Sequence, residues 1–176
     1  SAATAGNSIV IGVLWNNAGT VSVADNRGNT YTSATARTAW GNNWSSQVFY
    51  ATNIVGGATT VTATFGTAIN GWGIIYIHEY AGLGKVNPVD VTKSAIGTGS
   101  AMSSGSVATT NATDLLFAFG ASSNRVTAAG SGYTTRSTAY GNRTQDRTVS
   151  ATGSYAATAT QNGNAWVMQL VAFRAD

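Results

Sequence analysis

The chain contains no cysteine, one histidine and one proline among its 176 residues. The absence of cysteine excludes a disulfide scaffold, a thiolate metal site and a cysteine nucleophile, although it leaves the cellular compartment open. Charged residues make up 9% of the chain, whereas typical soluble domains have about 25%. No apolar run approaches the roughly 18 residues that a membrane helix requires. The sequence therefore predicts a protein without a membrane span.

Solubility must come from hydroxyls and amides rather than from charge. This composition is common in extracellular β-proteins and in subunits that bury most of their outer surface. The net charge is +3, and the nine basic residues are spread singly along the chain, so a nucleic-acid partner is not expected. The chain begins with "SAATAG", without Met or a charged and then apolar leader, and we interpret it as a mature or trimmed chain.

Strand signals dominate the sequence, whereas helical periodicity is almost absent. Short runs rich in Val, Ile, Thr, Tyr and Phe alternate with Gly, Asn and Ser clusters at intervals of about ten residues. This spacing predicts one all-β domain over residues 1–176, an antiparallel β-sandwich of jelly-roll or immunoglobulin-like kind. The predicted strands cover residues 8–15, 20–25, 29–36, 46–53, 58–65, 72–81, 105–110, 114–122, 132–139, 147–155 and 165–174.

Two of the predicted strands are apolar on both faces. They are "WGIIYIHEYA" (72–81) and "AWVMQLVAFR" (165–174). A strand with one wet face alternates apolar and polar residues, so a strand without this alternation should lie between two layers or under another covering element. We therefore expect both segments to be core strands.

Six blocks of sequence, in the same order over almost the whole chain, resemble a family of secreted bacterial β-sandwich modules. The blocks are "TAGNSIVIGVLW", "DNRGNTYT", "VFYATNIVGGATTVTATF", "EYAGLGKVNPVDV", "TTNATDLLFAFG" and "QDRTVSATGSYAATA…WVMQLVAFR". Members of this family occur in large extracellular and cell-surface proteins. The resemblance implies a non-enzymatic architectural or binding role outside the cell, and it carries over no catalytic residues.

In that family a strand precedes the "TAGNSIV" block, whereas this chain begins almost on it. The resemblance therefore implies that strand 8–15 or its neighbour lacks a partner and exposes unpaired backbone groups. A second chain is expected to pair there by β-addition and to link copies head to tail, preferably in a filament. The alternative is that the C-terminal strand, 165–174, folds back to fill the vacancy.

The adjacent residues His78 and Glu79 do not form a catalytic pair, because neighbours in a strand point to opposite faces. A carboxylate on an apolar strand needs a partner, and we expect a structural ion pair of Glu79 with Arg147 or Arg174. Glycoside hydrolysis needs two carboxylates about 5–10 Å apart, and Glu79 and Asp146 are the mid-strand candidates. The sequence predicts no catalytic, metal-binding or cofactor-binding residues and hence no enzyme.

The stretch "TAWGNNWSSQVFY" places two tryptophans, Trp40 and Trp44, in a Gly- and Asn-rich connection. They can cap the open end of the sandwich, form a subunit contact, or stack on sugar rings. Side chains that could assist a sugar or subunit contact are Asn42, Asn43 and Gln47, and a second, weaker loop offers Tyr140 and Arg143.

The prediction from these features is a non-catalytic extracellular structural or adhesive subunit that assembles with copies of itself through exposed edges and apolar outer faces. A carbohydrate-binding module that uses the loop tryptophans to bind a polysaccharide is the alternative.

Overall fold

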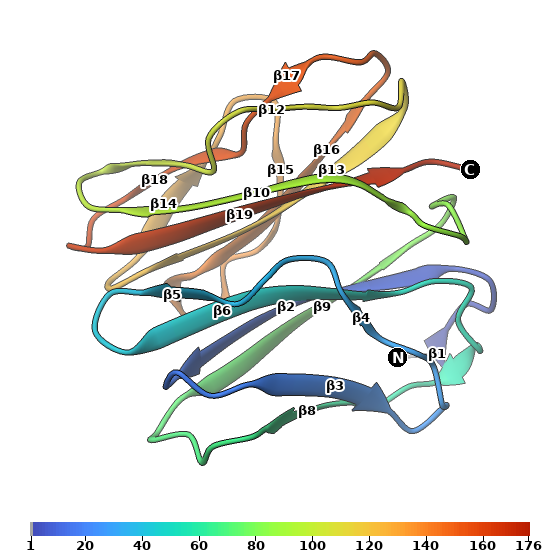
Figure 1. Cartoon of the computed structure of the whole chain (residues 1–176), viewed down its shortest axis with the longest axis horizontal. Helices are drawn as coiled ribbons and strands as arrows, with labels where there is room; N and C mark the ends of the chain where they lie inside the picture. The colour runs from blue at the N-terminus through green and yellow to red at the C-terminus, as the bar shows by residue number, and fades with distance from the viewer. Residues whose placement is uncertain (1) are drawn as a thin grey trace.

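The computed structural model describes residues 2–176 and is built almost entirely from antiparallel strands in stacked layers, which Figure 1 shows from the side. The predicted all-β antiparallel fold is confirmed. The first central sheet has the order β4-β6-β2-β9, with β5 also paired to β6. Its strands are β2 (Ser8–Asn16), β4 (Thr32–Ser33), β5 (Thr38–Trp40), β6 (Trp44–Ala51) and β9 (Gly73–Tyr80).

The second central sheet packs face to face on the first and has the order β10-β19-β13-β16-β15. A short 3₁₀ turn, η1 (Ala139–Gly141), joins its last two strands. Its strands are β10 (Val89–Gly97), β13 (Asp114–Ser122), β15 (Thr134–Ser137), β16 (Arg143–Val149) and β19 (Trp166–Arg174).

Smaller sheets cover the outer face of each central sheet. Over the first lie the pair β3 (Val21–Asp25) and β8 (Val61–Phe65) and the short pair β1 (Ala2–Ala3) and β7 (Gly57–Ala58). Over the second lie β11 (Ala101–Ser103), β14 (Val126–Ala129), β18 (Thr158–Gln161), β12 (Val107–Ala108) and β17 (Ser154–Tyr155). The stack therefore has four layers.

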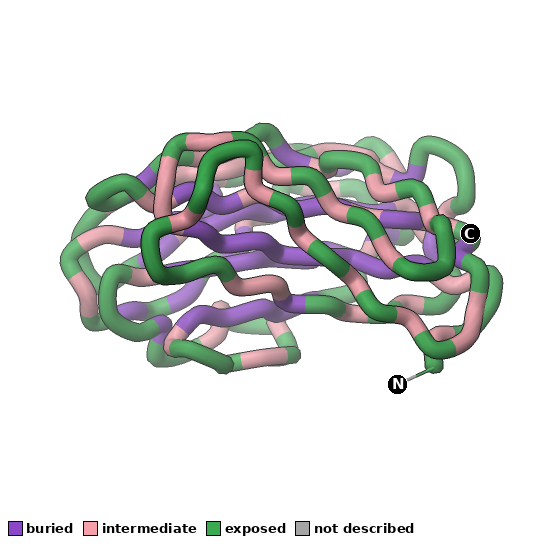
Figure 2. The backbone as a smooth tube through the Cα atoms, turned by 90° about the horizontal axis from the view of Figure 1, so that it is seen from below, coloured by how far each residue is buried: buried purple, intermediate pink, exposed green. Residues whose placement is uncertain are grey.

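Three apolar clusters fill the three spaces between these layers, and the period-2 alternation of strand side chains distributes them. In β2, Val10 and Leu14 point to the central cluster, whereas Ile9 and Ile11 point outward to the β3–β8 layer. Each buried side chain of this size contributes roughly 1.5–3 kcal/mol relative to exposure. In Figure 2 the buried residues accordingly follow the long central strands, whereas the outer strand pair β3–β8 alternates between exposed and intermediate positions.

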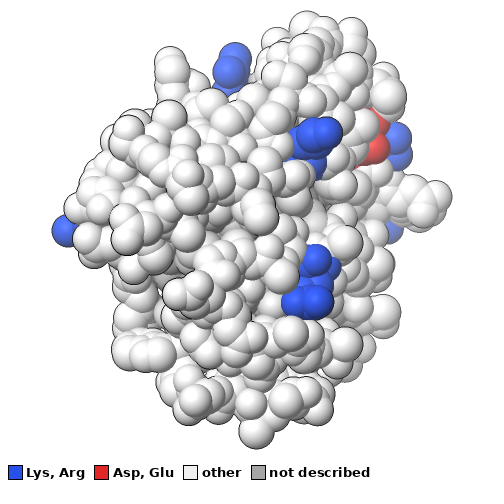
Figure 3. All heavy atoms as spheres, turned by 60° about the vertical axis from the view of Figure 1, so that its left-hand side comes forward, with Lys and Arg blue, Asp and Glu red and all other residues white. Residues whose placement is uncertain are grey.

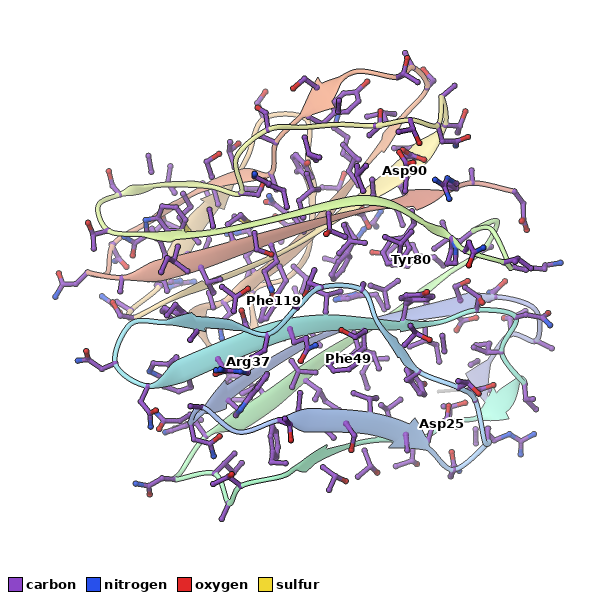
Figure 4. All side chains as sticks on the ribbon, viewed as in Figure 1. Asp25, Arg37, Phe49, Tyr80, Asp90 and Phe119 are labelled. Atoms are coloured by element: carbon purple, nitrogen blue, oxygen red, sulfur yellow. The ribbon has the colours of Figure 1, made fainter. Side chains whose placement is uncertain are left out.

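The second central sheet divides its side chains in the same way. Phe117 and Phe119 of β13 face the first sheet, whereas Leu116 and Ala118 face the outer layer. Figure 4 shows Phe119 and Tyr80 between the two central sheets and Phe49 on the side of the β3 layer. At Gly12 a Cβ atom would lie 3.0 Å from the ring of Phe119, so glycine allows the two sheets to approach here.

The two strands predicted to be apolar on both faces have different positions. Strand β19 is buried at every residue from Trp166 to Phe173 and lies between β10 and β13, which confirms that prediction. The prediction that 72–81 is a core strand is wrong, because β9 is the last strand of its sheet and pairs only with β2. Its outward Ile77 is 45% exposed.

The prediction that strand 8–15 or its neighbour lacks a partner is wrong for strand 8–15 itself, whereas its neighbour β9 is unpaired on its outer side within the described residues. Strand β2 pairs with β6 on one side and with β9 on the other, so its edges are satisfied within one chain. Strand β19 does not fill a vacancy there either, because it belongs to the second central sheet. The expected head-to-tail link through β2 is therefore wrong.

Candidate functional site

The longest unpaired backbone in the first central sheet is the outer edge of β9. The amide of Asn16 donates to the carbonyl oxygen of Trp72 at 3.0 Å, which identifies this pair as a hydrogen-bonded one. Hydrogen-bonded pairs alternate with non-bonded pairs along an antiparallel ladder. In the register Gly12↔Tyr76 and Val10↔His78, the backbone N–H and C=O groups of the even-numbered residues of β9 therefore bond to β2. The odd-numbered residues point their N–H and C=O groups away from the sheet. They are Gly73, Ile75, Ile77 and Glu79.

The side chains along this edge are mostly apolar. Ile77 is 45% exposed, and Trp72, just before the strand, is 55% exposed. Ile75 is partly buried against the outer β3–β8 layer. The edge carries no lysine, proline or β-bulge, and its one charged side chain, Glu79, is bound by the amide of Thr4 and the side chain of Asn7.

The first residues of β9 also border a cleft of about 290 Å³ at the end of the molecule where β5 and β6 meet. Aromatic side chains form its walls, and amides and hydroxyls complete it. The lining residues are Leu14, Trp40, Trp44, Trp72, Ile74, Ser122, Ser123, Asn124, Tyr140 and Asn142. Figure 3 turns this end of the molecule toward the viewer, and the surface there is largely uncharged with separate basic side chains.

Tyr140 stands at the rim of this cleft in a strained conformation. Its φ is 54° and its ψ is 27°, in the left-handed region that costs a non-glycine residue about 1 kcal/mol or more. The side chain is 71% exposed and meets Trp72 edge to face, with ring centroids 6.3 Å apart. Such strain often marks a residue held in place for a contact.

A hydrogen-bond network fixes the backbone that carries Tyr140. The hydroxyl of Tyr76 donates to the carbonyl oxygen of Ala139 at 2.8 Å, and the side-chain amide of Asn142 donates to the same hydroxyl at 2.9 Å. Asn142 and Tyr76 are both buried. The 3₁₀ turn is thus anchored to the inner face of β9, and the cleft is preformed.

The structure brings together only part of the predicted contact set. Trp40 and Trp44 stack with centroids 6.2 Å apart and an interplanar angle of 28°. Trp40 is only 4% exposed and belongs to the central apolar cluster, which fits the alternative that it caps the end of the sandwich rather than an open sugar platform, and it forms a wall of the cleft. Asn42 and Asn43 are exposed and do not line this cleft.

The other two predicted polar contacts have internal roles. Gln47 donates to the hydroxyl of Ser33 and to the carbonyl oxygen of Thr35 at 2.7 and 2.9 Å. Arg143 is buried and donates to the hydroxyl of Thr135 and to the carbonyl oxygen of Thr127. Both side chains are engaged in hydrogen bonds within the fold, and of the two only Arg143 is buried.

The predicted ion pair of Glu79 is also wrong. The Glu79 carboxylate accepts hydrogen bonds from the amide of Thr4 at 2.8 Å and from the side chain of Asn7 at 2.6 Å, which lower its pKa. Arg174 pairs with Asp90 at 2.9 Å, and the guanidinium of Arg147 lies 5.7 Å from the ring centroid of Tyr155. Glu79 therefore fastens the N-terminal segment to β9.

The remaining candidate acid and the histidine lie on the other face of β9. Asp146 is buried and accepts from Arg136 at 2.6 Å and from the Tyr80 hydroxyl at 2.7 Å. His78 packs against Phe117 with centroids 5.7 Å apart, and burial lowers its pKa. Because Glu79 points outward and Asp146 inward, the two carboxylates do not face a common substrate position.

Sequence reasoning missed the exposure of Trp72. The predicted strand 72–81 begins with Trp72, although the segment "INGWG" around it contains two glycines that signal a turn rather than a strand. Among the described residues no group of three or more His, Asp or Glu side chains could hold a metal ion. Nor does that part of the chain contain a helix that is long and apolar enough to cross a membrane.

No protein-family model, curated protein or solved structure matches the chain. The resemblance to secreted bacterial modules therefore stays a prediction.

Proposed function

We propose that the chain is a non-catalytic structural or adhesive subunit that assembles with copies of itself through the open edge of β9. The observation that carries this proposal is the row of outward backbone groups at Gly73, Ile75, Ile77 and Glu79, flanked by exposed apolar side chains. An unpaired strand of this kind is a template for pairing with another chain. Buried backbone groups must be paired, so any contact that covers this edge must also supply hydrogen bonds.

The low charge of the surface supports the same proposal. A chain with 9% charged residues has little electrostatic repulsion between copies. The composition and the family resemblance favour an extracellular or cell-surface location. Catalysis is not part of the proposal, because the candidate groups Glu79, His78 and Asp146 serve packing and internal hydrogen bonding.

The test is the oligomeric state of the native protein, measured by analytical ultracentrifugation and electron microscopy. We expect association that Ile77→Lys abolishes, because a charge on an edge strand opposes pairing. The matched control is Ile96→Lys, which places the same charge at a 55% exposed isoleucine of β10. A strictly monomeric wild-type protein at high concentration, or equal effects of the two variants, would contradict the proposal. Electron microscopy separates a closed oligomer from a filament.

A second candidate function, carbohydrate binding, is favoured by the cleft. Its exposed aromatic pair Trp72 and Tyr140 lies beside Asn124 and the hydroxyls of Ser122 and Ser123. An aromatic face with neighbouring amides and hydroxyls suits a sugar ring. We expect retention on cellulose, chitin or xylan, reduced about tenfold by Trp72→Ala or Tyr140→Ala. Ile96→Ala is the control. Retention on none of the glycans, or retention unchanged in both aromatic variants, would remove this candidate.

A further inference from the structure

We infer that two copies pair their β9 strands antiparallel about a two-fold axis at Tyr76, with Ile75 of one copy opposite Ile77 of the other. This inference rests on the proposed function and adds its partner and register. It follows from the positions of the outward backbone groups, from the side chains beside them and from symmetry.

The first argument is hydrogen bonding. A two-fold axis perpendicular to a sheet relates two identical edge strands in antiparallel orientation. The outward groups of β9 belong to Gly73, Ile75, Ile77 and Glu79. Centring on Tyr76 places Gly73 opposite Glu79 of the second copy and Ile75 opposite its Ile77. Every outward residue then has a partner, and each such pair exchanges two hydrogen bonds.

Neighbouring registers satisfy fewer backbone groups. A shift of the second copy by two residues leaves one outward residue of each copy beyond the pairing. A shift by one residue sets outward residues opposite inward ones, whose N–H and C=O groups already bond to β2. The register centred on Tyr76 is therefore the most favourable antiparallel arrangement of this edge.

The second argument is the side chains that this register brings together. On the outer face it forms two Ile75–Ile77 cross-strand pairs, and directly opposed β-branched residues stabilise a sheet. Glu79, the one charged residue of the strand, faces Gly73 rather than another Glu79. Like charges are thus kept apart, and the small Gly73 leaves room for the Glu79 side chain.

The third argument is what becomes covered. Trp72 immediately precedes the strand and would lie opposite Tyr80 of the second copy in the same register. Trp72 is 55% exposed and Ile77 is 45% exposed in one copy. Both belong to the small set of large apolar side chains that the described part of the chain leaves exposed. A second copy is the favoured occupant because this register pairs every outward backbone group of the edge and keeps the two Glu79 side chains apart.

The test uses the absence of cysteine from the chain. Ile75→Cys and Ile77→Cys variants are prepared separately, mixed, and oxidised under mild conditions. Directly opposite residues of a hydrogen-bonded pair have Cα atoms about 5.5 Å apart, within the range that a disulfide bridges. Residue 75 of one copy and residue 75 of the other are diagonal at about 7–8 Å, which is too far.

We expect about tenfold more disulfide-linked dimer in the mixture than in either variant oxidised alone. The control mixture of Ile77→Cys with Ile96→Cys should form no dimer above the level of the single variants. Circular dichroism checks that all variants fold. If the wild-type protein associates but the mixture shows no preference over the single variants, the register is overturned and the proposed function stands. If the wild-type protein is monomeric, both fall.

Discussion

Strands β9 and β10 are the long edge strands of the two central sheets. They differ in the features that keep the unpaired backbone groups of an edge from pairing with another chain. Strand β10 carries the exposed Lys93 and Thr92 and a register irregularity between Val89 and Val91, although its Ile96 is also exposed. Strand β9 has a regular register with β2 and presents Ile75 and Ile77. Lysine and bulges keep an edge strand from pairing with other chains. Because β10 has a lysine and a register irregularity that β9 lacks, the proposed association uses the edge of β9 rather than that of β10.

The largest expected effect tests the assignment of backbone groups in β9, in which even-numbered residues bond to β2 and odd-numbered residues point away from the sheet. Proline at His78 would remove an amide that bonds to Val10, whereas proline at Ile77 removes an amide that points away from the sheet. We expect His78→Pro to lower the free energy of unfolding by about 3 kcal/mol and Ile77→Pro by about 1 kcal/mol. Urea denaturation measures both.

His78→Ala and Ile77→Ala serve as controls for the loss of each side chain. Equal losses for the two proline variants, after this correction, would mean that the outward edge of β9 has been assigned to the wrong residues.

The next largest effect concerns β10, where Asp90 connects the strand by hydrogen bonds to Thr110 and Asn111 and by an ion pair to Arg174. Burial acts to raise the pKa of Asp90, but hydrogen bonds from Thr110, Asn111 and Arg174 outweigh it and lower the pKa to about 2 from 3.8. The folded state therefore binds its proton later than the unfolded state. The stabilisation is present above about pH 4 and is lost as the pH falls toward 2.

We expect the wild type to lose on the order of 2 kcal/mol over this interval relative to Asp90→Asn. Urea midpoints at pH 5, 4, 3 and 2 measure the difference. If the free energy of unfolding of the two proteins changed with pH in parallel, Asp90 would not be the acid-sensitive contact of β10.

The free energy of unfolding also depends on pH through His78 of β9, in a higher pH range than through Asp90. Burial lowers the pKa of His78 below 6.5, with Asp146 acting to raise it and Arg136 to lower it. The unfolded state then takes up the proton first, so the stabilisation is present above pH 6.5 and is lost as the pH falls below it. The loss is at most about 1.4 kcal/mol per pH unit.

His78→Phe should flatten this dependence between pH 7 and 5.5, because phenylalanine fits between Phe117 and Tyr80 without titrating. Thermal unfolding over that range measures it. A slope that persists in the variant would assign the pH dependence to another group.

The smallest effect on stability comes from Lys93→Val, which we expect to change the free energy of unfolding by less than about 0.5 kcal/mol because Lys93 is exposed. Its effect on association should be larger, since it removes the charge that protects β10. Light scattering at increasing concentration should rise for Lys93→Val and stay unchanged for Lys85→Val, a second exposed lysine outside both edges. No difference between these variants would remove the protective role of Lys93.

The sequence predicted the central strands well because their apolar runs are strong. Predicted strands 8–15, 114–122 and 165–174 agree with β2, β13 and β19 to within one residue. Strand β10 was missed, because "VDVTKSAIG" follows a proline and mixes polar with apolar residues. The features that protect this edge also weakened its strand signal.

The neighbours of each strand were harder to predict than the strands themselves. An apolar strand at the edge of a sheet has the same local pattern as one at its centre, so β9 was taken for a core strand. The partner of Glu79 was missed for a similar reason. A backbone amide such as that of Thr4 satisfies a carboxylate as well as an arginine does, and no sequence pattern marks it. The residues of the candidate site could therefore not be predicted from the sequence, because the tertiary fold decides which residues become neighbours.

The four-layer stack also determines which parts of the molecule can open separately. Strands β2 and β19 are covered on both faces, whereas the strand pair β3–β8 lies on one face of the first central sheet and is itself half exposed. This pair can move away from the sheet by uncovering one apolar cluster, with the other two intact. Amide hydrogens of β3 and β8 should then exchange with deuterium through local opening, whereas those of β2 and β19 exchange only on global unfolding.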